Sequence, residues 1–329
     1  MQVKEKIGVN DFMISIAMAT YNGEKYLREQ LDSILSQTIT DWELIVCDDC
    51  SKDTTVGILK SYQRKDGRVK IFVNEKNLGF KKNFEKAIGL CSGDYIALAD
   101  QDDIWHDNHL EVLLGLIGEV SLSCGNARLM TSDSVVTEKK LNEVDNLLFI
   151  PIEKEKLLYR IVFISDPFQG ASMLIRKEFL SKILPIPDGV LYHDAWIAAC
   201  ACMENGIAYT FDPITDYRQH ENNVTVAARR LEKRSIVRKI KNGYKVLFQG
   251  KILYSDRFCY IKELEQKYGF ENVDFKRIRR VYNHMETSRL SPFDVLFLLK
   301  NWFYISTSKT YKGFFSFILK LLYLRPYNE

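Results

Sequence analysis

Long apolar runs are missing from this 329-residue chain, although 46% of its residues are hydrophobic. No stretch of 18 or more residues is apolar throughout, so the sequence predicts no membrane-spanning helix. The first eleven residues are polar and charged, and we therefore expect no secretory signal peptide. The seven cysteines lie mostly within apolar runs, which is typical of reduced, buried thiols rather than of a disulfide framework. These features predict a globular protein of the cytoplasm.

Several common ligand-binding motifs are also absent. No G-x-G-x-x-G follows the first apolar segment, which argues against a dinucleotide-binding enzyme. No helix-turn-helix, RNP-like or zinc-finger pattern is present, so we expect no nucleic-acid partner. Cys47 and Cys50 form a C-x-x-C, but neither a second cysteine pair nor a thioredoxin-like context accompanies it.

Charge is nearly balanced overall, at +3, but it is unevenly distributed. Residues 229–329 contain 22 Lys and Arg against 9 Asp and Glu, whereas the first 228 residues contain 24 against 34. An acidic N-terminal part and a basic, aromatic-rich C-terminal part indicate two regions with different tasks. We place these parts at residues 1–225 and 226–329.

Strand-like and helix-like segments alternate over the first hundred residues. Strand patterns cover 13–19, 42–47, 69–73 and 95–99, and helical patterns cover 24–37, 54–65 and 81–90. This alternation predicts an α/β fold, Rossmann-like, with a mostly parallel sheet flanked by helices. Beyond it we expect helices at 110–122, 153–162 and 192–204, strands at 127–132 and 208–211, and an irregular segment at 135–146. The basic part predicts a mainly helical extension, with helices at 231–248, 251–268, 275–288 and 292–304.

Acidic side chains follow the strand patterns. The apolar run 95–99 ends in Asp100, Asp102 and Asp103, and the second strand ends in the acidic segment 48–53. In a parallel sheet these ends meet at one edge, where like charges repel unless a cation binds. Mg²⁺ and Mn²⁺ prefer oxygen ligands, so Asp100-Gln-Asp102 is a candidate D-x-D metal site. The alternative is a polar turn that caps a helix starting near Ile104.

An ordered set of motifs resembles one enzyme family. The motifs are Ala19-Thr-Tyr-Asn-Gly23, Val46-Cys-Asp-Asp-Cys-Ser-Lys-Asp53, Asn77-Leu-Gly79, Gly93-Asp-Tyr-Ile96, Asp100-Gln-Asp-Asp-Ile-Trp105, His193-Asp194 and Tyr217-Arg-Gln-His220. Together they resemble glycosyltransferase family 2, inverting enzymes with the GT-A fold, over roughly residues 12–225. The Asp-Gln-Asp-Asp-Ile-Trp variant is similar to the bacterial rhamnosyltransferase-like branch that builds surface polysaccharides. Residues 226–329 are not covered by this resemblance.

The resemblance implies nucleotide and metal ligands. Asp49 would accept a hydrogen bond from a pyrimidine N3–H, and Asp100 would contact the ribose or the metal. Asp102 would bind Mn²⁺ or Mg²⁺ directly, which would offset charge on the leaving diphosphate. His220 would be a further metal ligand or a diphosphate contact. The remaining implied nucleotide-binding residues are Thr20, Tyr21, Asn22 and Lys76. For Lys76 the alternative, which surface lysines usually follow, is a solvated side chain.

The resemblance also implies an acceptor side. Asp194 would be the general base that takes the proton of the attacking hydroxyl. The family usually has an acidic pair here, whereas this chain has His193-Asp194, so the role falls on Asp194 alone. An N-cap for the following helix is the alternative role of Asp194. The remaining implied substrate-binding residues are Asp103, Trp105, Gln169, Gly170, His193 and Arg218.

The expected partners follow from these roles. The donor is expected to be dTDP-rhamnose or a UDP-hexose, and the acceptor a saccharide or lipid-linked saccharide. The basic, aromatic extension suits contact with the anionic inner face of the cell membrane, or else a homodimer face. Two other functions stay open: a nucleotidyltransferase, and an inactive nucleotide-sugar-binding scaffold.

Overall fold

The computed structural model describes residues 12–144, 153–163, 168–221, 223, 250–269, 273–286 and 291–301. Contacts divide the chain into two compact units. The first contains residues 1–147, 168–187 and 192–218, and the second contains 148–167, 188–191 and 219–329. The expected domain boundary between residues 225 and 226 lies outside the described residues, so it stays a prediction.

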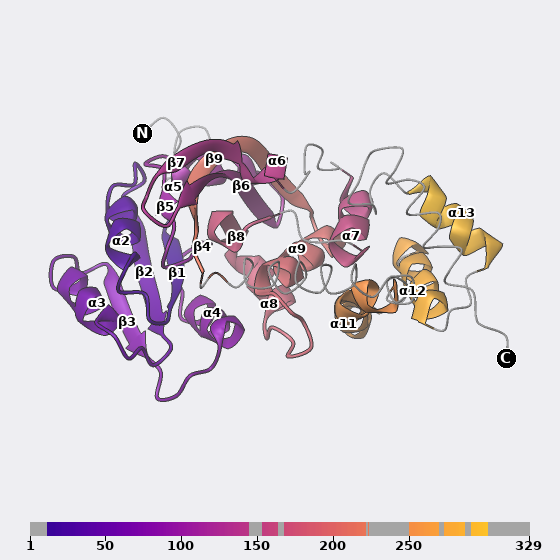
Figure 1. The fold of residues 1–329 in the computed structure, drawn as a ribbon, viewed down its shortest axis with the longest axis horizontal. Helices are drawn as coiled ribbons and strands as arrows, with labels where there is room; N and C mark the ends of the chain where they lie inside the picture. The colour runs from indigo at the N-terminus through magenta and orange to yellow at the C-terminus, as the bar shows by residue number, and fades with distance from the viewer. Residues whose placement is uncertain are drawn as a thin grey trace, which may run out of the picture. The chain divides into compact units, whose positions relative to one another are not determined.

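Four parallel strands form the first half of the sheet in unit 1 (Figure 1). They are β1 (Ile14–Thr20), β2 (Trp42–Asp48), β3 (Val69–Val73) and β4 (Tyr95–Ala99), in the spatial order β3-β2-β1-β4. The connections contain α2 (Leu27–Leu35), α3 (Thr55–Gln63) and α4 (Phe80–Gly89). The alternation read from the sequence is therefore confirmed.

Antiparallel strands complete the sheet, which has nine strands in the described part of the chain. β8 (Met173–Arg176) lies antiparallel to β4, and β6 (Leu122–Thr131) lies antiparallel to β8. Beyond β6 come β9 (Ile207–Gln219) and β5 (Ile104–Trp105), while β7 (Val136–Lys140) pairs with β6 outside this path. The accompanying helices are α5 (His109–Ile117), α6 (Leu141–Val144), α8 (Leu180–Ile183) and α9 (His193–Met203), with short 3₁₀ turns η1 (Gly170–Ser172) and η2 (Lys177–Phe179).

Three expectations for this half are corrected. The described part of the segment expected to be irregular, residues 135–144, is regular from residue 136 on, because it forms β7 and α6. The helix expected at 110–122 ends at Ile117, since Gly118 follows with φ 39° and the chain then enters β6. The short strand expected at 208–211 is the start of β9, which continues to Gln219. Polar residues in the later part of β9 are held by the fold: Asp216 is buried and accepts from Arg128 Nε at 2.7 Å.

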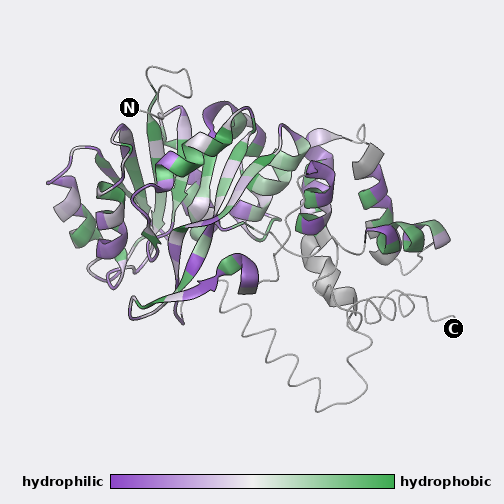
Figure 2. Cartoon of the chain, turned by 90° about the horizontal axis from the view of Figure 1, so that it is seen from above, coloured by the Kyte–Doolittle hydropathy of each residue, from purple (hydrophilic) through white to green (hydrophobic). Residues whose placement is uncertain are grey.

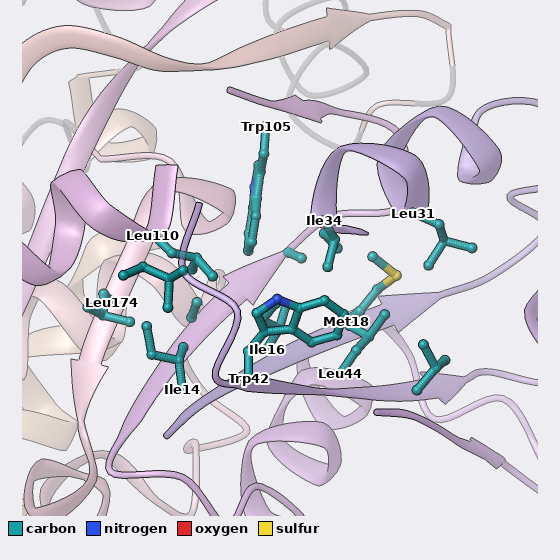
Figure 3. Close-up of a cluster of buried hydrophobic side chains, with 14 of the residues drawn as sticks. Ile14, Ile16, Met18, Leu31, Ile34, Trp42, Leu44, Trp105, Leu110 and Leu174 are labelled. Carbon is teal, nitrogen blue, oxygen red and sulfur yellow. The ribbon is translucent and has the colours of Figure 1, made fainter. Parts of the chain in front are cut away.

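A hydrophobic core lies between the strands and the helices on one face (Figure 3). Alternate residues of β1 point into it, together with residues of α2, α3 and α5. The core members labelled in Figure 3 are Ile14, Ile16, Met18, Leu31, Ile34, Trp42, Leu44, Trp105, Leu110 and Leu174. Burying each such large side chain contributes roughly 1.5–3 kcal/mol. Figure 2 shows the same strands mostly in the hydrophobic colour, which is typical of a sheet covered on both faces.

A polar network crosses the start of the strands, at the end opposite the Thr20 and Asp48 loops. Glu43 accepts hydrogen bonds from Ser15 Oγ at 2.6 Å, Lys70 Nζ at 2.7 Å and Ser92 N at 2.8 Å. Glu43 is only 4% exposed. Burial alone would raise its pKa, but the hydrogen bonds from Lys70, Ser15 and Ser92 outweigh burial and lower the pKa from 4.5 to about 2.

We expect Glu43→Gln to lower the free energy of unfolding by about 2–3 kcal/mol at pH 7, because the charged hydrogen bonds are lost. A lowered pKa in the folded state stabilises the protein above pH 4.5, and this contribution is lost as the pH falls towards 2. The difference between wild type and variant should therefore shrink over that window in urea titrations at several pH values. A difference that stays constant from pH 6 to pH 3 would contradict this explanation.

Unit 2 is helical in its described residues. It contains α7 (Lys154–Phe163), α11 (Gly250–Tyr268), α12 (Val273–Glu286) and α13 (Pro292–Lys300), which confirms four of the expected helices. Ser291 caps α13 by accepting from Asp294 N, and the Asp294 carboxylate accepts from Ser291 N in return. The expected helix at 231–248 lies outside the described residues. None of the helices in the described ranges combines the length and the apolar character that crossing a membrane requires.

Candidate active site

Three parallel strands end at the edge of the sheet where the sequence places its motifs. The register sets Thr20 beside Asp48 and Met18 beside Ala99. The loops that follow β1, β2 and β4 therefore meet at one edge, which is where open α/β sheets bind their ligands.

The loops after β1 and β2 are tied together by buried polar groups. The Thr20 hydroxyl donates to Asp48 Oδ2 at 2.9 Å, and Ser51 Oγ donates to the same oxygen at 2.5 Å. Thr20 is 1% exposed, so its side chain serves the protein interior. The predicted contact of Thr20 with a nucleotide stays a prediction.

Tyr21 and Asn22 form the outer part of the first loop. Asn22 has a left-handed backbone with φ 47°, which asparagine tolerates better than most residues. Its backbone N–H donates to Ser51 Oγ at 2.9 Å, and its side-chain oxygen accepts from Lys52 N at 2.8 Å. Tyr21 remains 48% exposed and is accessible to a ligand.

Gln101 joins the first loop to the aspartate segment, and sequence reasoning gave it no role. Its Oε1 accepts from Tyr21 N at 2.9 Å, while its Nε2 donates to Tyr21 O at 3.1 Å. A Cβ added at Gly23 would lie 2.3 Å from Gln101 Oε1, so this contact needs a glycine. Two features of the sequence could have revealed this contact. One is a glutamine between two aspartates, and the other is the glycine that directly follows Thr-Tyr-Asn.

Asp49 organises the loop between β3 and α4. Its Oδ1 accepts from Asn74 Nδ2 at 2.8 Å and from Leu78 N at 2.7 Å, and its Oδ2 accepts from Gly79 N at 2.8 Å. Gly79 needs its glycine because its φ is 80°. Asp49 is 2% exposed. A carboxylate oxygen can accept two hydrogen bonds, and among the bonds found in the described residues Oδ2 has one.

Three carboxylates gather beyond β4. Burial, together with the negative charges of Asp102 and Asp194, raises the pKa of Asp100 to about 8. Asp100 and Asp194 are 94 positions apart in the chain, so the fold brings them together. A cation bound between these carboxylates would relieve their mutual repulsion, but within the described residues no three such side chains are grouped to hold one by themselves.

Asp103 and Arg218 support this cluster from within the protein. Asp103 is fully buried and accepts from Gln169 Nε2 at 2.7 Å and from Arg218 N at 3.0 Å. Burial and the charges of Asp102 and Asp100 raise its pKa, against the opposing effect of Arg218. We interpret Asp103, Gln169 and Arg218 as residues that hold the site in shape, and their direct contact with substrate stays a prediction.

The Arg218 side chain is fully buried and engaged on all three nitrogens. Nε donates to Asp102 O at 2.7 Å, Nη1 to Ser134 Oγ at 2.8 Å and Nη2 to Glu29 Oε2 at 3.0 Å. The guanidinium also lies over the Tyr26 ring, 4.4 Å from its centroid. The arginine therefore fixes the backbone of the metal-site candidate.

Trp105 is part of the core rather than an open surface. It is 2% exposed, and its Nε1 donates to Ala171 O at 3.1 Å. Its ring stacks on the His109 ring with 3.9 Å between the two ring centroids. Burial lowers the pKa of His109 to about 3, so this histidine is neutral. Any contact of Trp105 with substrate stays a prediction.

Asp194 lies in the first turn of α9, next to Gly170. Tyr192 occupies the N-cap position, so the alternative role of Asp194 as N-cap is wrong; its Oδ1 instead accepts from Ala195 N at 2.8 Å. A Cβ added at Gly170 would lie 3.2 Å from His193 Nε2 and 3.8 Å from Asp194 Oδ2. The structure therefore brings Gly170, His193 and Asp194 together.

Lys76 and His220 are the two remaining residues to which the resemblance assigns nucleotide or metal binding. Lys76 is an exposed residue of the loop between β3 and α4. His220 belongs to unit 2, where its backbone N–H donates to Asn223 Oδ1 at 2.5 Å. Their predicted roles stay predictions.

Comparison with known proteins identifies the family. Residues 15–184 match the model of glycosyl transferase family 2, which is more than half of the chain. The chain belongs to glycosyl transferase family 2. The resemblance inferred from the ordered motifs is thereby confirmed, and with it the prediction of a glycosyltransferase at the level of the family.

Curated relatives in the family are similar over part of the chain. A UDP-Glc:alpha-D-GlcNAc-diphosphoundecaprenol beta-1,3-glucosyltransferase, WfgD, of Escherichia coli is 35% identical over 130 residues, which is 39% of this chain and 51% of that protein. The dTDP-rhamnosyl transferase RfbG of Shigella flexneri is 27% identical over 219 residues, or 63% of this chain and 72% of that one. The chain thus spans about half the length of WfgD.

Solved structures show the fold. TarS of S. aureus in complex with UDP-GlcNAc has a TM-score of 0.56 at 18% identity, with 89% of this chain and 78% of that chain covered. A mannosyltransferase of Pyrobaculum calidifontis in complex with GDP-Man and Mn²⁺ has a TM-score of 0.53 at 15% identity, with 94% and 84% covered. The prediction of a GT-A fold with a helical C-terminal part is confirmed.

Proposed function

We propose that this chain is an inverting glycosyltransferase that moves a sugar from a pyrimidine nucleotide-sugar to a hydroxyl of a glycan or lipid-linked saccharide, in bacterial surface polysaccharide synthesis. The observation that carries the proposal is the convergence of Asp100, Asp102 and Asp194 at the edge that also holds Asp49. Membership of glycosyl transferase family 2 supports transfer of a sugar over a nucleotidyl group.

The donor side of the proposal rests on Asp49 and the first loop. The remaining hydrogen-bonding capacity of Asp49 Oδ2 suits a pyrimidine N3–H, and the exposed Tyr21 suits contact with the base or ribose. Two similar proteins, the UDP-Glc glucosyltransferase WfgD and the dTDP-rhamnosyl transferase RfbG, support a UDP-hexose or dTDP-rhamnose as the donor.

The reaction itself rests on Asp194. Asp194 would take the proton of the acceptor hydroxyl as that oxygen attacks the anomeric carbon of the donor. The anomeric carbon–oxygen bond to the diphosphate breaks as the new bond forms on the opposite face, which inverts the configuration. An inactive scaffold is the alternative, and binding without turnover would favour it.

A divalent cation fits the carboxylate cluster. Within the described residues no three His, Cys, Asp or Glu side chains are grouped to hold a metal by themselves. Mg²⁺ is commonly held by one or two carboxylates together with substrate phosphates, so Asp102 with Asp100 would suffice once a donor is present. A bound Mn²⁺ or Mg²⁺ would supply charge compensation for the departing diphosphate.

The role of residues 226–329 remains a proposal. Their basic, aromatic composition suits peripheral contact with the inner face of the cell membrane or a homodimer face. Deleting residues 290–329 is expected to remove the protein from the membrane fraction if that contact is real.

Nucleotide binding gives the first test. With Mn²⁺ present, we expect UDP or dTDP to raise the melting temperature, because a ligand at 100 times its Kd stabilises the folded state by about 2.7 kcal/mol. Asp102→Ala should abolish the metal-dependent part of the shift, whereas Asp212→Ala, an exposed carboxylate on β9, should not. GDP, a purine nucleotide, and CDP, whose pyrimidine has no N3–H, provide the nucleotide controls. If neither UDP nor dTDP shifts the wild type, the proposed donor site is wrong.

A further inference from the structure

Three polar side chains form a hydrogen-bonded chain that ends on the carboxylate of Asp49. Lys86 Nζ donates to Asn74 Oδ1 at 2.7 Å, and Asn74 Nδ2 donates to Asp49 Oδ1 at 2.8 Å. Asn74 Nδ2 also donates to Asn83 Oδ1 at 2.8 Å, and Asn83 Nδ2 donates to the backbone oxygen of Cys47 at 2.7 Å. Asn74 is 5% exposed and Asn83 is 1% exposed. We call Asn74, Asn83 and Lys86 the amide relay.

The amide relay occupies positions where apolar side chains would pack as well. Asn83 is one of four buried residues of α4, and the other three are apolar. Lys86 lies three positions further along, so it shares a side of the helix with Asn83. A buried polar network is costly unless all its members are hydrogen-bonded. Every side-chain nitrogen and oxygen of Asn74 and Asn83 has a partner, so this network is complete.

The ammonium group of Lys86 fixes the direction of the Asn74 amide. An amide side chain accepts at its oxygen and donates at its nitrogen. With its oxygen on Lys86, the amide turns its nitrogen towards Asp49. The reversed amide would place its nitrogen against the ammonium and its oxygen against the carboxylate, which would leave buried polar groups without hydrogen bonds. Lys86 therefore acts on Asp49 through Asn74.

Asp49 is held in place by three donors. Its Oδ1 accepts from Asn74 Nδ2 and from Leu78 N, which fills the two acceptor positions of that oxygen. Its Oδ2 accepts from Gly79 N, so one acceptor position of Oδ2 stays open among the described residues. Leu78 belongs to a loop that is exposed over residues 75–78, whereas Asn74 is buried. The amide relay is thus the support that reaches Asp49 from the protein interior.

We propose that the amide relay positions Asp49 and thereby makes the donor site selective for uracil or thymine over cytosine. Uracil and thymine present N3–H to the open acceptor position of Oδ2. Cytosine has no N3–H, but its N4 amino group is a donor one ring position away. A carboxylate that is free to turn can accept from that amino group instead, whereas a fixed carboxylate cannot follow it. The proposal rests on the donor role of Asp49 proposed above, and it adds the residues that make this role selective.

Nucleotide affinity measured by isothermal titration of the full chain with Mn²⁺ tests the proposal. UDP is compared with CDP, and dTDP with 5-methyl-dCDP, so that each pair differs only at positions 3 and 4 of the base. The quantity of interest is the ratio of the two dissociation constants in a pair. A general loss of stability does not change this ratio, because both nucleotides bind the same folded state. The wild type should prefer UDP or dTDP by about tenfold or more, and Asp49→Ala should bring the ratio close to one.

Lys86→Met keeps the aliphatic stem of the lysine and removes its donor. This variant and Asn74→Ala should each lower the ratio about three- to tenfold, as expected for a weakened hydrogen bond to a carboxylate. Lys86→Met should have no further effect in the Asn74→Ala background, because Lys86 acts through Asn74. Lys86→Arg still offers an N–H to Asn74 and should keep the ratio within about twofold of the wild type. Asn74→Ala tests the relay independently if Lys86→Met folds poorly.

The matched control is Lys60→Met, since Lys60 is an exposed lysine in the last turn of α3. If Lys86→Met and Asn74→Ala leave the ratio as unchanged as Lys60→Met does, while Asp49→Ala still removes it, the inference is overturned and the proposed donor site stands. Additive losses in the double variant would overturn it too, because Lys86 would then act independently of Asn74. If the wild type binds neither UDP nor dTDP, or if Asp49→Ala keeps the wild-type preference, the proposed donor site is wrong and the inference with it.

Discussion

Asp194→Asn is expected to lower kcat by about 10²–10⁴-fold, the range typical of losing a positioned general base. Asparagine has nearly the same shape, and its side-chain oxygen can still accept from Ala195 N at the start of α9. The loss should therefore fall on the chemical step. Single-turnover measurements of sugar transfer at saturating donor would report it directly.

Nucleotide binding provides the control for this variant. The metal-dependent thermal shift with UDP or dTDP should survive Asp194→Asn, because Asp194 is assigned to the acceptor side. Transfer at the wild-type rate would show that another group takes the proton. Binding without transfer in the wild type as well would favour the inactive scaffold.

Arg218→Ala should destabilise the first unit by about 3 kcal/mol. The substitution removes three hydrogen bonds, leaves a cavity against Tyr26, and deprives Asp102 O of its partner. This loss lies at the low end of the roughly 3–5 kcal/mol expected for a broken buried ion pair, because the Glu29 side chain is 41% exposed. Urea denaturation of the nucleotide-free protein would measure the change.

The matched control is an arginine on the surface. Arg64 is exposed and follows α3, so Arg64→Ala should change stability by no more than about 0.5 kcal/mol. If Arg218→Ala is equally mild but abolishes binding of donor, Arg218 contacts the substrate, as first predicted from the resemblance. A large loss of stability instead supports the structural role read from its burial.

The strands and the edge that carries the site could be predicted from the sequence. The runs ending at Thr20, Asp48 and Ala99 are apolar, and helical segments separate them, which leaves parallel pairing as the natural arrangement. Parallel strands place their carboxyl ends together, so the acidic residues that follow were expected to converge. The charge of Asp194 helps to raise the pKa of Asp100, so these residues, far apart in the chain, come near one another in the fold.

The direction of individual side chains could not be predicted in the same way. The family resemblance implied that Arg218 and Asp103 bind substrate, and charged side chains are mostly exposed in folded proteins. Their burial depends on partners such as Glu29 and Gln169, which lie far away in sequence. Gln101 was missed for a related reason, since its partner is the backbone of Tyr21, which no side-chain pattern reveals.

The sequence by itself determined the fold class, the family and the edge of the sheet at which the polar motifs gather, because apolar periodicity and motif order are local properties of the chain. Only the tertiary structure decided which motif residues face inward, which backbone groups they hold, and that His193 is buried beside Asp194 and Gly170, with no hydrogen-bond partner for its ring among the described residues. The physical reason is that burial and hydrogen bonding depend on the distance between residues in space. Residues 170 and 193 come from different segments, and only the folded chain brings them to the same point.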